Sequence, residues 1–369
     1  MKIDNIRYYG EDFRFHTGSV EVRDGRIAAV EAFECTTVYT LIPGLIDIHQ
    51  HGNSGADFSD GDYDGLMRMA RYHALHGVTS FTPASMTLPE ERLHTAYRTA
   101  VQLRDAQPGG HAVIRGIYME GPFFSEEKKG AQSAAHLRLP DAEMVRRLNA
   151  SADGMIRIVC VAPELDGALS FIREMTSSVR VSIGHTNAEY AVAAEGFHAG
   201  AAQVTHLFNA MPPMLHRAPG VIGAASECDT VFAELICDGI HVHESVVRAV
   251  FRLFPGRICL VSDSMAACGM PDGQYELGGQ TVIAQGGRAL LSDGTLAGSA
   301  TPLYVCMQNA IRYGIPPEQA ICAATHTPAK MIGADALVGS IAEGKRADLV
   351  LCDDDWDIRD VLLGGESVS

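Results

Sequence analysis

The chain has 369 residues, and its 45 Asp plus Glu outnumber its 29 Lys plus Arg, so the formal charge is −16. With 47% hydrophobic and 20% charged residues, it has the composition of a folded globular protein. An acidic chain without a cluster of Lys and Arg is unsuited to nucleic acid or to an anionic membrane surface, because both require positive charge on the protein. We therefore expect neither kind of partner.

Segments that would direct the chain to a membrane are not recognisable. The N-terminal decapeptide MKIDNIRYYG is polar, and no stretch approaches the ~18 to 20 apolar residues of a membrane span. Nine cysteines are scattered from Cys35 to Cys352 without a Cys-x-x-Cys pair, which favours reduced thiols over a disulfide framework. These features indicate a cytoplasmic protein.

Both ends of the chain are predicted to form strands. Residues with β propensity are separated by turn signals such as Asp24-Gly25. The expected strands are 6–9, 18–22 and 26–30 near the N-terminus, and 338–341 and 347–352 near the C-terminus. We expect segments 1–42 and 336–369 to form one small β-sandwich domain.

Between these ends, apolar strands alternate with polar loops and helical stretches. The expected strands are 41–48, 78–82, 113–119, 156–161, 179–183, 202–205, 231–237 and 258–261. Eight parallel βα units predict an α/β fold in which residues 43–335 close into a (β/α)8 TIM-like barrel. Helices are expected at 64–76 and 141–148, and we interpret His73 and His76 on the first as a surface pair.

Side chains able to bind a metal follow several of these strands, on the face where barrels carry their active sites. His49 and His51 are two residues apart, so both imidazoles can point to one place, as a metal requires. The alternative is two ordinary polar residues at the start of a loop.

Four further polar residues occur at equivalent points of other βα units. Taken singly, Glu120 is as well explained as the partner of a cation, His185 and His206 as hydrogen-bonded core histidines, and Asp263 as a helix cap. Together with His49 and His51, they indicate a metal centre with an adjacent proton carrier.

Longer motifs carry a resemblance to a known family. They are PGLIDIHQHG, MEGPFFSEEKKGAQ, SIGHTNAEY, THLFNAM, ICDGIHVH, VSDSMAACGMPDG, LAGSA and GSIAEGKRADLVL, and they extend from residue 43 to about 351. The sequence resembles the amidohydrolase superfamily and, within it, the N-acetylglucosamine-6-phosphate deacetylases. The resemblance implies metal-dependent hydrolysis of the substrate's acetamide to glucosamine-6-phosphate and acetate.

The same resemblance implies the roles of particular residues. Glu120, His185 and His206 correspond to the principal metal site, while His49 and His51 would complete a second one. Such ligands suit Zn²⁺ or Fe²⁺, with one or two ions per subunit. Asp263 matches the catalytic aspartate, which would take a proton from water and deliver it to the amine nitrogen.

Substrate-binding residues and a homodimer are implied in the same way. The phosphate would be bound by Arg217 and His241 and by the backbone N–H groups of Asn209 and Ala210, with part of this contact supplied by a neighbouring subunit. Ala131 and the segment Leu296, Ala297 and Gly298 would line the sugar. Many relatives have His after the motif KGA, whereas this chain has Gln132, which could alter the preference among amino sugar epimers.

Three alternatives stay open at this point. The substrate could be another acylated amino sugar phosphate, such as N-acetylgalactosamine-6-phosphate, or a cyclic amide. The chain could also be a non-catalytic scaffold, because a fold alone never establishes an activity. Scaffolds of this kind usually lose metal ligands, and every expected ligand type is present here.

Overall fold

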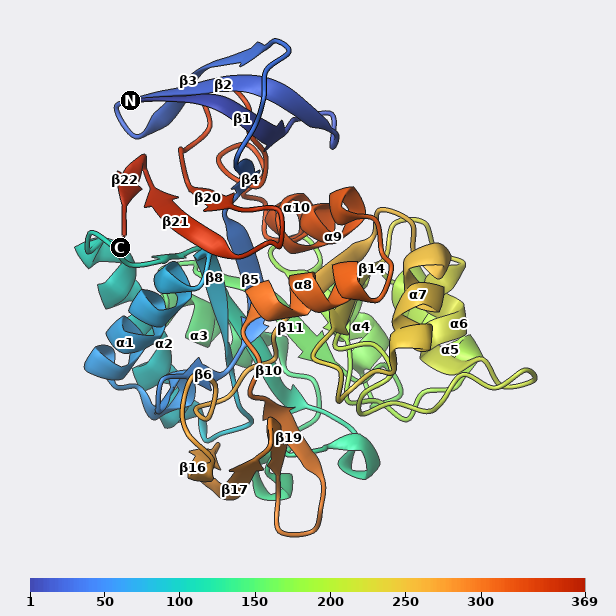
Figure 1. Ribbon diagram of the computed structural model, residues 1–369. Helices are drawn as coiled ribbons and strands as arrows, with labels where there is room; N and C mark the ends of the chain where they lie inside the picture. Colours follow the sequence, from blue (N-terminus) through green and yellow to red (C-terminus); the bar gives the residue numbers. More distant parts are fainter. Residues whose placement is uncertain (369) are drawn as a thin grey trace.

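The computed structural model describes residues 1–368 and contains the predicted parallel barrel (Figure 1). Eight strands are hydrogen-bonded in chain order. They are β5 (Leu45–Gln50), β8 (Val78–Ser85), β10 (Ile117–Phe123), β11 (Ile156–Val161), β12 (Arg180–Ile183), β13 (Gln203–Val204), β14 (Phe232–Ile236) and β15 (Ile258–Val261). A short ninth strand, β9 (Val113–Ile114), pairs with β8. The α/β barrel fold is therefore confirmed.

The last barrel strand meets the first through hydrogen bonds at their carboxyl ends. The backbone N–H of Asp263 donates to the His49 carbonyl at 2.9 Å, and the N–H of His51 donates to the Ser264 carbonyl at 2.7 Å. Deeper in the barrel, the Ser262 hydroxyl donates to Asp47 Oδ2 at 2.6 Å. The closing contact of the barrel thus includes two predicted metal ligands and the predicted catalytic aspartate.

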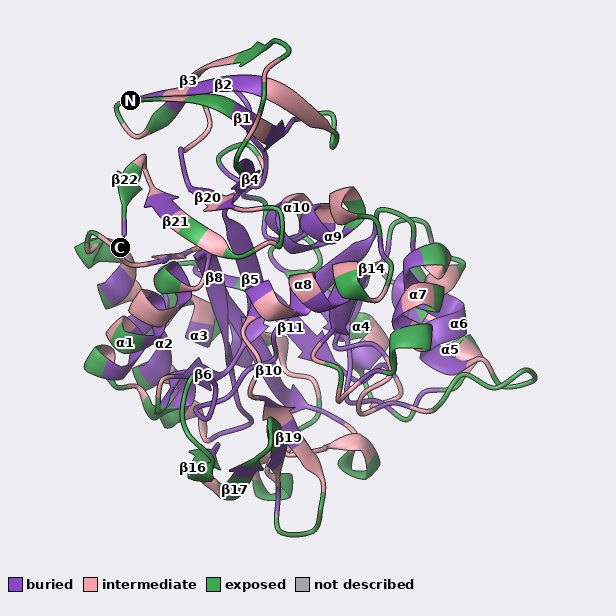
Figure 2. Ribbon diagram, in the orientation of Figure 1, coloured by how far each residue is buried: buried purple, intermediate pink, exposed green. Residues whose placement is uncertain are grey.

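Helices cover the outside of the barrel and leave its interior buried (Figure 2). Those between barrel strands are α1 (Tyr63–Leu75), α2 (Glu90–Ala106), α3 (Ala142–Ser151), α4 (Ala168–Met175), α5 (Tyr190–His198), α6 (Gly220–Ser226) and α7 (Glu244–Leu253). After the last strand come α8 (Leu303–Arg312), α9 (Pro317–Ala324) and α10 (His326–Met331). Asp62 caps α1 by accepting from the N–H groups of Asp64 and Gly65.

Within residues 1–368, no helix has the length and apolar character needed to cross a membrane.

The two ends of the chain form one seven-stranded sheet, in the order β22-β21-β20-β4-β1-β2-β3. Its strands are β1 (Lys2–Tyr9), β2 (Phe15–Arg23), β3 (Arg26–Ala32), β4 (Thr40–Pro43), β20 (Leu349–Cys352), β21 (Ile358–Leu363) and β22 (Glu366–Ser367). Val20, Ile27 and Leu349 from its two halves share one buried cluster. The backbones of Arg26 and Arg346 also pair in an isolated antiparallel β-bridge. The sheet therefore curls so that its halves enclose a core of their own.

Several expected strands differ from the observed ones only in their bounds, and three differ in kind. The expected strand 41–48 is divided at Gly44, because residues before it join the terminal sheet and residues after it join the barrel. A Cβ at Gly44 would lie 2.2 Å from the Thr79 side chain, so only glycine fits at this crossing. The expected strand 113–119 is divided between β9 and β10. Residues 338–341 are not a strand, and Ile341 contributes only one bridge, to Gly10.

A second small sheet covers the opposite end of the barrel from the terminal sheet (Figure 1). It consists of β16 (Gly273–Leu277), β17 (Gln280–Gln285), β18 (Arg288–Leu290) and β19 (Leu296–Ser299). The shorter elements are β6 (Gly52–Asn53), β7 (Ala56–Asp57) and the 3-10 helices η1 (Phe58–Asp60), η2 (Glu126–Lys128) and η3 (Ala134–His136). Because β16–β19 follow β15 directly, they lie at the carboxyl ends of the barrel strands.

Candidate metal centre and active site

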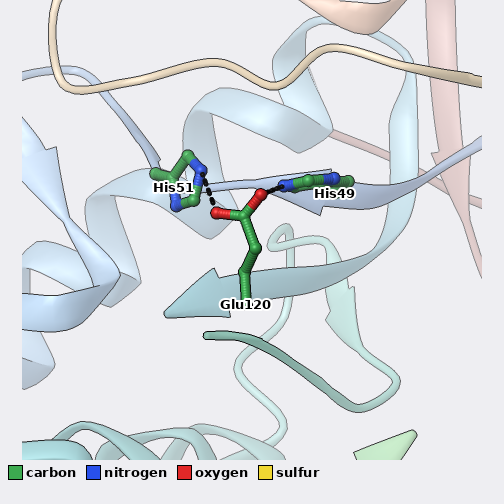
Figure 3. Close-up of side chains that lie close together, drawn as sticks. All are labelled: His49, His51 and Glu120. Carbon is green, nitrogen blue, oxygen red and sulfur yellow. Dashed lines mark ion pairs between the residues drawn. The ribbon is translucent and has the colours of Figure 1, made fainter. Parts of the chain in front are cut away.

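Glu120 lies at the centre of the predicted metal ligands. It belongs to β10, and its carboxylate lies between two histidine pairs from other strands. Glu120 Oε1 is 3.3 Å from His49 Nε2, and Glu120 Oε2 is 3.3 Å from His51 Nε2 (Figure 3). Glu120 Oε1 is also 3.1 Å from His185 Nε2 and 3.2 Å from His206 Nε2. The structure therefore brings all five predicted ligands together in two overlapping triads that share Glu120.

The hydrogen bonds of these histidines fit a bound cation. His49 Nδ1 contacts Glu234 Oε2 at 2.8 Å, His51 Nδ1 contacts the Ala84 carbonyl at 3.1 Å, and His185 Nδ1 contacts the Lys128 carbonyl at 2.9 Å. An imidazole that donates through Nδ1 has, when neutral, only a lone pair on Nε2. Three such lone pairs then face the oxygens of one carboxylate, and a cation bound between them would satisfy both.

Three of the residues around the centre have left-handed backbone. φ is +48° at His185, +28° at His206 and +47° at Asp263, and each lies two residues beyond its barrel strand. Such a conformation costs on the order of 1 kcal/mol at a non-glycine residue and occurs preferentially at functional sites. It turns the three side chains into the mouth of the barrel.

The carboxylates of the site are held in their ionised form. Burial alone would raise the pKa of Glu120, but the neighbouring His49, His185 and His206 outweigh it, and the pKa lies well below its usual range. Burial likewise opposes ionisation of Asp263, yet His49 and His51 lower its pKa to about 2. Burial lowers the pKa of His185, which favours its neutral, metal-binding form. The site thus holds two ionised carboxylates beside a cluster of imidazoles.

A cavity of about 440 Å³ opens onto this centre. Its lining includes most of the predicted substrate residues, namely Ala131, Gln132, Asn209, Ala210, His241, Leu296 and Gly298. Ala297 is fully buried and does not line it. Arg217 lies outside the cavity, on an exposed loop where its Nη1 is 2.7 Å from His216 Nε2. The cavity of one chain therefore lacks the predicted arginine.

His241 is fixed at the cavity wall by Asp238. The Asp238 carboxylate contacts His241 Nδ1 at 2.7 Å and accepts from the N–H groups of Ile240 and His241. Burial disfavours the charged imidazole, but this carboxylate outweighs it and raises the pKa of His241. The contact with Asp238 thus fixes the orientation of the His241 ring at the cavity.

Several residues in or next to the site were not predicted from the sequence. Lys128 and Lys129 line the cavity, and their only signal was their place in the motif EEKKG. Glu234 is fully buried within β14 and touches His49. Glu234 is the one charged residue in the otherwise apolar segment VFAELIC. Because an unpaired charge is costly inside a barrel, this pattern could have indicated a buried partner for Glu234.

Comparisons with known proteins agree with this geometry. The sequence matches the model described as the amidohydrolase family over residues 40–368. N-acetylgalactosamine-6-phosphate deacetylase from Escherichia coli O157:H7 is 35% identical, covering 95% of this chain and 94% of that protein. N-acetylglucosamine-6-phosphate deacetylase from Bacillus subtilis is 36% identical, covering 97% and 94%.

Solved structures give the same result. A mutant N-acetyl-D-glucosamine-6-phosphate deacetylase from Mycobacterium smegmatis, in complex with N-acetyl-D-glucosamine-6-phosphate, superposes with a TM-score of 0.93. It is 31% identical, and the match covers 100% of this chain and 99% of that one.

Proposed function

Because the chain belongs to the amidohydrolase family, we propose that it hydrolyses the acetamide of N-acetylglucosamine-6-phosphate to glucosamine-6-phosphate and acetate. The observation that carries this proposal is the position of Glu120 between two histidine pairs, with Asp263 beside them at the wall of one cavity. A scaffold that had lost its chemistry would not be expected to retain this complete ligand set.

Asp263 is the proton carrier in this proposal. Its Oδ1 lies 3.3 Å from His51 Nε2 and faces the cavity, and its low pKa leaves it ionised at neutral pH. It accepts a proton from the attacking water and delivers it to the amine nitrogen, because an amide does not expel an unprotonated nitrogen. A divalent ion held by the Glu120 cluster would supply polarisation of the acetyl carbonyl and a lowered pKa of water.

The metal ligands are His49, His51, Glu120, His185 and His206. Their imidazole and carboxylate atoms suit Zn²⁺, which we propose as the resident metal, with Fe²⁺ as the alternative. The two overlapping triads offer places for one or two ions in each subunit.

The phosphate of the substrate is proposed to lie near His241 and the segment Asn209-Ala210. Asp238 contacts His241 through Nδ1 and leaves Nε2 available to a ligand. Lys128 and Lys129 line the same cavity. Arg217 belongs to the loop that extends from the barrel beside α5 and α6 (Figure 1). We propose that the chain forms a homodimer in which this arginine reaches the phosphate site of the other subunit.

A cytoplasmic location completes the proposal. All nine cysteines are free thiols, and six of them are buried. Reduced thiols are the usual state in a cytosolic compartment.

One assay tests the reaction, the substrate and the metal together. Purified protein is incubated with N-acetylglucosamine-6-phosphate, and acetate release is measured before and after treatment with a chelator. We expect acetate release that the chelator abolishes and that added Zn²⁺ or Fe²⁺ restores. Unphosphorylated N-acetylglucosamine is the control substrate and should react far more slowly. Absence of acetate from the metal-loaded protein would refute the proposal.

The galactosamine epimer is a second candidate substrate, favoured by one observation. The Escherichia coli relative named for that substrate is as similar, at 35% identity, as the Bacillus subtilis relative named for the glucosamine substrate, at 36%. Comparing kcat/KM for N-acetylglucosamine-6-phosphate and N-acetylgalactosamine-6-phosphate decides between them.

A further inference from the structure

Glu234 contacts residues of both triads while lying outside the cavity. Its side chain is fully buried in β14. Oε2 is 2.8 Å from His49 Nδ1 and also accepts the backbone N–H of His206 at 3.0 Å. His49 belongs to the first triad and His206 to the second. One carboxylate oxygen therefore touches a ligand residue from each half of the centre.

The other oxygen of Glu234 has a dedicated partner. Its Oε1 accepts from the side-chain amide of Gln203, a fully buried residue of the neighbouring strand β13. In the described residues no Lys or Arg forms an ion pair with Glu234, and His49 is its one such partner. A fully buried carboxylate with so little compensation is costly, which argues for a role beyond packing.

We propose that Glu234 is a positioning residue that sets the metal ligands of both triads. Its contact with His49 fixes Nδ1 as the donor, so that Nε2 presents a lone pair to the centre. Its negative charge makes that imidazole a stronger ligand. Its bond to the His206 N–H holds the left-handed turn that directs the His206 side chain inwards. This inference rests on the proposed metal centre.

The chain offers a variant that separates charge from geometry. Gln203 Oε1 is buried without a hydrogen-bond partner, so its amide can rotate and accept a bond instead of donating one. Glu234→Gln can then keep an acceptor towards His49 and His206 while its NH₂ group donates to Gln203. This substitution removes the charge and preserves the three contacts, whereas Glu234→Ala removes both.

The experiment measures metal affinity and stability separately. Each protein is stripped with a chelator, its melting temperature is recorded without metal, and Zn²⁺ is titrated against a chromophoric chelator. Visible absorption of Co²⁺-loaded protein reports the ligand geometry. Ser182→Ala is the matched control, because Ser182 is also fully buried in a barrel strand and its hydroxyl contacts Thr205 rather than a metal ligand.

We expect Glu234→Gln to weaken Zn²⁺ binding about tenfold and Glu234→Ala about a hundredfold. Glu234→Gln should melt within a few degrees of the unchanged chain without metal, with a Co²⁺ spectrum of unchanged shape. Ser182→Ala should bind Zn²⁺ normally. Unchanged Zn²⁺ affinity in Glu234→Ala would overturn the inference. It would also be overturned if the loss of Zn²⁺ affinity in each variant were proportional to its drop in melting temperature without metal. If the unchanged chain itself binds no divalent metal, the proposed function fails as well.

Discussion

The Gln132 side chain donates its amide to Glu120 Oε2 at 2.6 Å, and its carbonyl oxygen accepts the N–H of Thr87 at 2.7 Å. Because the Thr87 N–H can only donate, the amide orientation is fixed and its NH₂ group must face Glu120. Gln132, which the sequence predicts at the sugar, therefore holds the carboxylate shared by the two triads.

Replacing Gln132 by Ala should weaken the metal centre. The substitution removes the donor to Glu120 and leaves the Thr87 N–H without its acceptor, which costs about 1–3 kcal/mol in the free energy of unfolding. We expect Zn²⁺ affinity to fall about tenfold, measured by competition with a chromophoric chelator. Gln102→Ala, on the exposed face of α2, is the control and should change neither quantity. Normal affinity in Gln132→Ala would show that Glu120 is held by its other neighbours.

Replacing Asp263 by Asn should abolish most of the activity while leaving the Glu120, His185 and His206 triad intact. Asn has nearly the same shape as Asp but cannot carry a proton between water and the amine nitrogen. We expect kcat to fall by at least ~10²-fold. Metal content by mass spectrometry and kcat by acetate release are measured on the same sample. Turnover close to that of the unchanged chain would remove Asp263 from the mechanism.

Replacing Arg217 by Ala tests the proposed contribution of one subunit to the other. If Arg217 binds the substrate phosphate across a dimer, KM for the phosphorylated substrate should rise about 10-fold or more, because a charge-assisted contact is worth about 1.5–3 kcal/mol. kcat should change much less, and light scattering should still show a dimer. Arg252→Ala, exposed on α7, is the control. A monomeric protein with normal KM would contradict the proposed dimer.

His73 should make the protein sensitive to acid. It is a buried residue of α1, not the surface residue that its spacing from His76 indicated, and it faces Asn53 at 3.2 Å. Burial lowers the pKa of His73 to about 3, below its value of about 6.5 in the unfolded chain. The unfolded state therefore binds the proton more readily, so stability is retained above pH 6.5 and lost as the pH falls.

Between pH 7 and pH 5 this residue alone should reduce the free energy of unfolding by about 2 kcal/mol. Urea denaturation at several pH values measures the loss. His73→Gln keeps an acceptor for Asn53 without a titrating group and should lose correspondingly less stability. Identical pH profiles for the two proteins would mean that His73 is protonated in the folded state.

Much of the barrel could be predicted because its strands are apolar runs that end in polar residues. The strands at 156–161 and 258–261 have the predicted bounds. The run 41–48 was read as one strand because both of its halves are buried, and a hydrophobic pattern does not reveal that a strand changes sheets at Gly44. Residues 338–341 have strand-like composition and are buried, but they form a loop with a single bridge, from Ile341 to Gly10.

The ligands of the centre could be predicted for the same reason, because strand ends in a barrel converge on one face. The left-handed backbone of His185, His206 and Asp263 could not, because only a few per cent of non-glycine residues have a positive φ, and the enrichment of His and Asp among them does not single out particular positions. The bond from Gln132 to Glu120 was equally hidden, because it joins residues of two different segments.

The centre takes His49 from the first strand of the barrel, β5, and His51 from just after it, and both are hydrogen-bonded through their backbone to the segment that follows the last strand, β15. An ion bound by these two histidines would stabilise that contact between parts of the chain more than two hundred residues apart. By mass action, saturating metal then shifts the equilibrium away from any partly open barrel. Starvation for the metal should accordingly expose the seam between β5 and β15 to proteases before the helices on the far side.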